Sequence, residues 1–149
     1  MSSEKPEHQL APDEVDSWLA DSVVRTVTVH HTDPESALDI IEHGVDIAKS
    51  TLDAAWGQGF YSRTNSDPQH GSIAVWVAVR LMQPLEIMDS VRDAEILEEL
   101  TQRASTEDFR VAILASGYDG VLVHYGQHLV VVAFHNEQVK VMLREDDDA

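Results

Sequence analysis

The sequence predicts a single α+β domain, and three observations carry that prediction. The chain has 149 residues, of which 43% are hydrophobic, and this is enough to bury one core without metal or disulfide support. Segments with strand-like alternation are interrupted by segments with helical spacing, without the regular rhythm of a doubly wound sheet. Neither a Walker-type nor a Rossmann-type glycine loop is present. We therefore expect one domain over residues 13–144, between a flexible acidic N-terminus at 1–12 and an acidic tail at 145–149.

Four segments carry helix signals. Pro12 precedes acidic residues and then apolar residues at helical spacing, which predicts a short opening helix over residues 13–19. A second helix is expected over residues 36–43, and Gly44 suits the left-handed backbone that follows a last turn. Two more helices are expected over residues 93–104 and 109–115. The last of these also fits a strand by periodicity, and the Ser-Gly pair that follows it favours a helix.

The other apolar segments indicate strands. Residues 26–31 alternate valine with polar side chains, which is the pattern of a strand with one buried face. Residues 72–81 are dense in isoleucine, valine and tryptophan and indicate a mostly buried strand that ends before Pro84. Two valine-rich runs flank the turn Tyr125-Gly126-Gln127, as in a hairpin. Further strands are expected within 56–63 and over 85–88, 121–124, 129–134 and 139–143.

The formal net charge is −17, from 27 acidic and 10 basic residues, and it restricts the classes of partner. It argues against nucleic acid, because affinity for phosphates comes from lysine and arginine. The acidity fits solubility through self-repulsion or adaptation to high salt. Alternatively, the acidic residues form a surface that binds a basic protein or peptide or that imitates nucleic acid. The sequence leaves both explanations open.

Several classes of site are excluded by what the sequence lacks. The absence of cysteine excludes disulfide scaffolds, thiolate zinc sites and a cysteine nucleophile. The eight histidines show no recognised ligand spacing, so no metal site is predicted, and no nucleophile elbow of a serine hydrolase occurs. The N-terminus has no apolar leader, and no run approaches the roughly 18 apolar residues of a membrane span. We therefore expect a cytoplasmic protein without a membrane partner.

Six short motifs follow one another along the chain. They are Val29-His30-His31-Thr32, Ile40-Ile41-Glu42-His43-Gly44, Trp56-Gly57-Gln58-Gly59-Phe60-Tyr61, Pro84-Leu85-Glu86-Ile87, Gly117-Tyr118-Asp119-Gly120-Val121 and Val132-Ala133-Phe134-His135-Asn136-Glu137-Gln138-Val139. In this order and spacing the sequence resembles the bacterial and phage ADP-ribosyltransferase-like domains. The resemblance implies split mixed and antiparallel β-sheets with flanking helices. It also implies that NAD is the substrate from which ADP-ribose is transferred to an acceptor.

The resemblance assigns roles to particular residues. His31, followed by Thr32, would bond the adenine-side ribose of NAD, while the neighbouring backbone holds the nicotinamide amide. Tyr61, after the glycine-containing turn that includes Gly59, would stack on the nicotinamide ring, because a flat aromatic face holds a flat ring at little ordering cost. Arg63 either pairs with an NAD phosphate or lies in a solvated turn. Without the resemblance, His31 would be assigned to the surface or to its boundary, and Tyr61 to the core.

Transfer also needs a group that stabilises the reacting sugar. Breaking the glycosidic bond develops oxocarbenium character, which a carboxylate near the ribose normally stabilises. Counting back from Phe134, the position of the family's glutamate or glutamine falls on Val130, and its neighbour on the same strand face is His128. A bulge would bring Gln127 to that position instead. We therefore expect Gln127, His128 and Tyr61 to be the catalytic residues of a transferase. The alternative is a catalytically inactive module that binds a protein or peptide.

Overall fold

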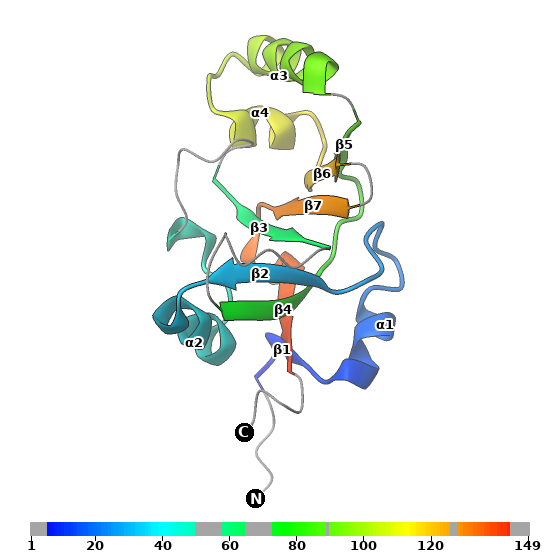
Figure 1. Ribbon diagram of the computed structural model, residues 1–149. Helices are drawn as coiled ribbons and strands as arrows, with labels where there is room; N and C mark the ends of the chain where they lie inside the picture. The colour runs from blue at the N-terminus through cyan, green and yellow to red at the C-terminus, as the bar shows by residue number, and fades with distance from the viewer. Residues whose placement is uncertain (1–5, 50–57, 65–72, 89, 126–127, 144–149) are drawn as a thin grey trace, which may run out of the picture.

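The computed structural model describes residues 6–49, 58–64, 73–88, 90–125 and 128–143. Strands of this part of the chain form one eight-stranded sheet in the order β1-β8-β4-β2-β3-β7-β6-β5 (Figure 1). The strands are β1 (Gln9–Leu10), β2 (Thr28–Thr32), β3 (Phe60–Arg63), β4 (Ile73–Val79), β5 (Leu85–Ile87), β6 (Gly120–Tyr125), β7 (His128–Ala133) and β8 (Val139–Met142). The helices are α1 (Val15–Trp18), α2 (Pro34–His43), α3 (Ser90–Ala104) and α4 (Phe109–Ala115), with 3-10 turns at Pro12–Glu14, Ile47–Lys49 and Asn136–Gln138.

The sheet is mixed, which confirms the α+β class expected from the sequence. Strands β1 and β8 are parallel, as are β5 and β6, and the other neighbours are antiparallel. At the centre, the described β2–β3 pairing consists of the register pair Val29–Arg63. By contrast, β2 matches β4 over five pairs and β3 matches β7 over four. The split expected from the resemblance is therefore a short junction within one sheet, not a gap between two separate sheets.

Helix α2 forms where its capping residues predict it. The Asp33 carboxylate accepts a hydrogen bond from the Ser36 amide at 2.7 Å, and Pro34 occupies the first turn. Gly44 follows the last turn with a φ of 86°, in the left-handed region that favours glycine. The ambiguity over α4 is resolved in favour of a helix, because the Asp108 carboxylate accepts from the Val111 amide at 3.1 Å and caps the first turn.

The sheet extends further toward the N-terminus than the sequence indicates. Gln9 and Leu10 form β1, which is parallel to β8, although both residues fall within the segment predicted as a flexible N-terminus. The Val141 amide donates to the His8 carbonyl at 2.7 Å, and Leu10 is buried. A two-residue strand whose partner lies at the opposite end of the chain leaves no local periodicity to detect.

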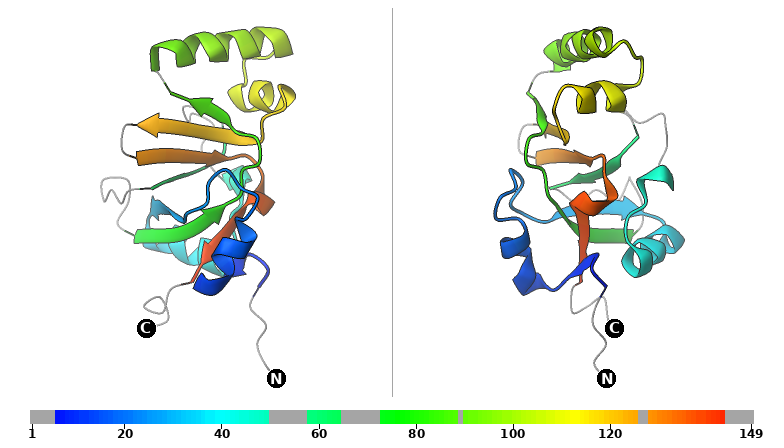
Figure 2. Two further views of the ribbon diagram at one scale, coloured as in Figure 1. Left: turned by 90° about the vertical axis from the view of Figure 1, so that its right-hand side faces the viewer. Right: turned by 180° about the vertical axis from the view of Figure 1, so that it is seen from behind.

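The core divides between the two faces of the sheet (Figure 2). On one face, α2 packs against a cluster that includes Val131 and Ala133 of β7. On the other face, α3 and α4 pack against Val130 and Val132 of the same strand, and α1 packs against Ala78 of β4. In the strand order, β2 and β3 lie between β4, against which α1 packs, and β7, against which α3 and α4 pack. The candidate site lies at these two central strands. No helix in the described ranges is long and apolar enough to cross a membrane.

Candidate functional site

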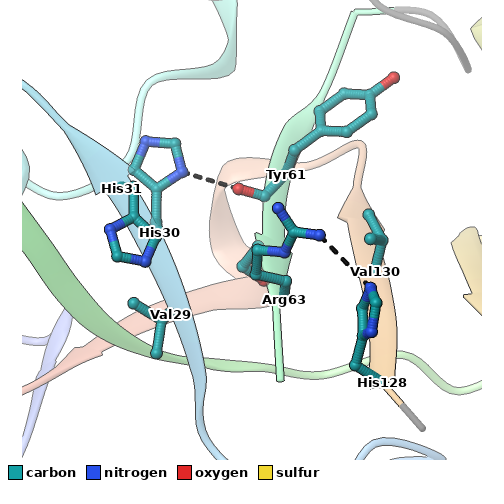
Figure 3. Close-up of a pocket in the computed structure, with 8 residues that line it drawn as sticks. Val29, His30, His31, Tyr61, Arg63, His128 and Val130 are labelled. Atoms are coloured by element: carbon teal, nitrogen blue, oxygen red, sulfur yellow. Dashed lines mark hydrogen bonds between the residues drawn. The ribbon is translucent and has the colours of Figure 1, made fainter. Parts of the chain in front are cut away.

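A cavity of about 430 Å³ opens where β2, β3 and β7 lie side by side (Figure 3). Three segments that are far apart in the sequence supply its walls. The described lining residues are Val29, His30 and His31 from β2, Tyr61, Ser62 and Arg63 from β3, and His128 and Val130 from β7. Apolar walls with a few polar groups are typical of small-molecule sites.

The structure brings four of the predicted site residues to this one cavity. They are His31, Tyr61, Arg63 and His128. Strand register explains the grouping, because residues directly opposite each other on neighbouring strands point to the same face. Arg63 is opposite both Val29 of β2 and Val130 of β7. His31, Tyr61 and His128 each lie two residues from a member of that row and share its face.

Three other predicted residues are not brought into the described cavity wall. Thr32 ends β2 opposite Ile73 and is not among the described lining residues. A side chain at Gly59 would meet the Ala133 carbonyl oxygen at 2.8 Å, so close packing against β7 accounts for this glycine. Gln127 lies outside the described residues.

Arg63 and His128 contact each other across β3 and β7. The Arg63 Nη2 lies 3.4 Å from the His128 Nε2, and Figure 3 shows this contact as a dashed line. A guanidinium can only donate, so the His128 Nε2 is the acceptor in this contact. Among the described lining residues, Arg63 carries a permanent positive charge, and none of these residues is a carboxylate. A guanidinium in this wall can pair with an anionic ligand group.

His30 also lines the cavity, and no role for it was predicted from the sequence. Its Nδ1 lies 2.7 Å from the Tyr61 carbonyl oxygen, and its ring centroid lies 4.3 Å from that of Phe60. Because a carbonyl only accepts, the proton of the neutral imidazole is on Nδ1. The only feature of the sequence that could have pointed to His30 is its place beside His31. Its contact with Tyr61 depends on how two strands that are distant in the sequence meet.

Burial lowers the pKa of His30 below its usual value near 6.5, although the Tyr61 carbonyl opposes this shift and the positive charge of protonated His31 adds to it. Between the unfolded and folded pKa values the unfolded chain binds more protons, so folded-state stability should fall as pH drops through that window. His30→Asn should remove this part of the pH dependence of the unfolding free energy, measured in urea. His43→Asn, at an exposed histidine on α2, is the control and should keep it. Equal pH slopes for His30→Asn and the unaltered protein would contradict this prediction.

Two further cavities differ from the first in charge. The charged residues that line one of about 450 Å³ are Glu7, Glu137 and Lys140, and those that line another of about 290 Å³ are Asp46, Glu137 and Arg110, so two carboxylates face one cation in each. Carboxylates in these walls disfavour an anionic ligand such as NAD. The described residues contain no group of three or more histidine, aspartate or glutamate side chains placed to hold a metal ion.

Comparisons of the chain with protein-family models, with curated proteins and with solved structures give no match. The order of the motifs and the geometry of the cavity are therefore the observations from which a function can be inferred.

Proposed function

We propose that this chain is an ADP-ribosyltransferase-like protein that binds NAD in the cavity between β2, β3 and β7. The observation that carries the proposal is that His31, Tyr61, Arg63 and His128, chosen from the resemblance, line the same cavity. These residues come from three separate strands, and random placement would scatter them over the sheet.

The cavity suits part or all of such a ligand. Its volume of about 430 Å³ lies within the range of roughly 300–1,000 Å³ that is typical of small-molecule sites. The Arg63 guanidinium would pair with the pyrophosphate, His31 would bond a ribose hydroxyl, and the half-buried Tyr61 would offer a ring face to the nicotinamide. In Figure 3 the Tyr61 ring points away from His30 and His31 of β2, so the nicotinamide end of NAD would lie away from the ribose that His31 holds.

ADP-ribose transfer would make further demands on the same cavity. Cleavage of the bond between nicotinamide and ribose develops positive charge on the sugar, which needs a negative or strongly polar partner. In the proposed transferase this partner is Gln127 or His128, the two alternatives that the resemblance leaves for the role. The bond between nicotinamide and ribose breaks, nicotinamide leaves as a neutral molecule, and the acceptor nucleophile bonds to the anomeric carbon of the ribose and releases its proton to solvent.

One observation favours a second function, which is binding without turnover. The count back from Phe134 assigns the position of the family's glutamate or glutamine to Val130, and this residue lines the cavity. An alkyl group cannot stabilise an oxocarbenium ion, so a protein relying on this position would hold NAD or a related molecule without cleaving it. In that case the acidic surface, with a net charge of −17, would suit a basic protein or peptide partner.

Nicotinamide release from NAD distinguishes these functions. If the protein is a transferase, the full chain should release nicotinamide, and His31→Ala and Tyr61→Ala should each slow release by at least about tenfold, the rate equivalent of 1.36 kcal/mol. His8→Ala, which alters a different cavity, is the matched control and should release at the original rate. Saturable NAD binding without release would instead establish the binding module, and absence of both would refute the proposed site.

A further inference from the structure

Strands β2 and β3 pair over a short stretch and separate beyond it. They share the register pair Val29–Arg63, and the buried Thr28 hydroxyl donates to the Ser62 hydroxyl at 2.7 Å. If the same register continued, His31 would lie opposite Tyr61, but the described pairing ends before that position. In Figure 1 the two strands diverge from this end of β3 toward its beginning.

The Tyr61 carbonyl is directed at β2, where a paired strand would supply its hydrogen-bond donor. The Thr64 amide donates to the Leu129 carbonyl of the β7 side at 3.0 Å, so the backbone groups of Arg63 and Tyr61 point the other way. The donor that meets the Tyr61 carbonyl from β2 is the His30 side chain, at 2.7 Å. An imidazole is much longer than a backbone N–H, so this contact keeps the two strands further apart than a ladder would.

The same ring makes a second contact with β3. Its centroid lies 4.3 Å from that of Phe60, and the two planes are tilted by 32°. Phe60 is itself buried in the core cluster that α2 covers. The His30 ring is therefore fixed from two directions, by a hydrogen bond to the backbone and by an aromatic contact anchored in the core.

We propose that His30 is a positioning residue whose imidazole holds β2 and β3 apart beyond Val29–Arg63. This spacing opens the cavity between His31 and Tyr61, the two side chains expected to hold NAD. The relevance to NAD rests on the proposed function, whereas the spacing is a property of the sheet and can be tested without a ligand. Burial, which keeps this imidazole neutral, matches the role, because a neutral ring with its proton on Nδ1 satisfies the Tyr61 carbonyl.

The first test is the tautomer of His30 in the unaltered full chain, from ¹⁵N chemical shifts of the imidazole. We expect the proton on Nδ1 and none on Nε2. A proton on Nε2 alone would overturn the proposal, because the ring could not then donate to Tyr61. This measurement needs no variant and no ligand.

The second test compares His30→Val with His30→Asn. Valine favours strands and cannot donate, so we expect NMR cross-peaks between the His31 and Tyr61 amides as the ladder closes, with NAD affinity falling at least about tenfold. The asparagine amide can still donate to the Tyr61 carbonyl, and it should keep the strands apart and the affinity within about threefold, the span of less than one lost hydrogen bond.

The outcomes separate this proposal from the proposed function. Strands that stay apart in His30→Val, with NAD binding unchanged, would overturn the role of His30. If the unaltered protein fails to bind NAD, the proposed function fails, while the tautomer and the cross-peaks still decide whether His30 sets the strand spacing. If His30→Val does not fold, the His30 tautomer and the NAD affinity of His30→Asn decide whether the proposal holds.

Discussion

Replacing Arg63 with glutamate is expected to lower the affinity for NAD by at least about 100-fold, or roughly 2.8 kcal/mol. The substitution removes the permanent positive charge among the described lining residues and puts a carboxylate in its place. It also removes the donor that contacts the His128 Nε2, so the β7 wall loses a fixed neighbour. Isothermal titration calorimetry with NAD measures the effect.

The control for this substitution is Arg103→Glu. Arg103 lies on α3, is exposed, and pairs with Glu99 at 2.6 Å, away from the cavity. The two variants change the net charge of the chain equally, so any general repulsion of NAD affects both. Arg103→Glu should bind NAD within about twofold of the unaltered protein, since exposed pairs contribute less than about 1 kcal/mol. Equal losses in the two variants would show that Arg63 does not contact the ligand.

Gly120→Ala is expected to destabilise the fold by about 3 kcal/mol, at the upper end of overpacking effects. A Cβ at this position would lie 2.5 Å from the Val132 carbonyl oxygen and 2.6 Å from the Leu81 Cδ2. The leucine can rotate, but the carbonyl belongs to the β6–β7 ladder and cannot move without breaking it. Urea denaturation followed by circular dichroism measures the change.

Gly117→Ala serves as the comparison for Gly120→Ala. A Cβ on Gly117 meets no atom within 4 Å, so its cost comes only from its positive φ of 93° and should be about 1 kcal/mol. We therefore expect Gly120→Ala to be the more destabilising of the two. The reverse order would mean that β6 does not pack against Leu81 and Val132 as described.

The sequence predicts the elements whose signals are local. Helix α2 is bounded by an aspartate cap and a left-handed glycine, and both act within a few residues. The hairpin of β6 and β7 likewise follows from two valine-rich runs around a short turn. Strand β1 could not be predicted, because Gln9 and Leu10 gain their strand geometry from a partner at the far end of the chain.

For the candidate site, residues and the strand faces they share could be predicted from the sequence, but the distances between neighbouring strands could not. Alternation along β3 places Tyr61 and Arg63 on one face, and counting along β7 placed His128 and Val130 beside each other on a face. The contact of His30 with the Tyr61 carbonyl depends on where β2 and β3 stop pairing, which is set by tertiary structure. The resemblance therefore points to His31, while the role of His30 emerges only from the structure.

The measurement that most directly tests the central claim is an NMR titration of the full chain with NAD. Saturable shifts are expected at amides of β2, β3 and the start of β7, centred on His31, Tyr61 and His128. The amides around Glu7 and Glu137 report on a different cavity and should stay unchanged. Absence of saturable shifts, or shifts confined to that second cavity, would contradict the assignment of the cavity between β2, β3 and β7 as an NAD site.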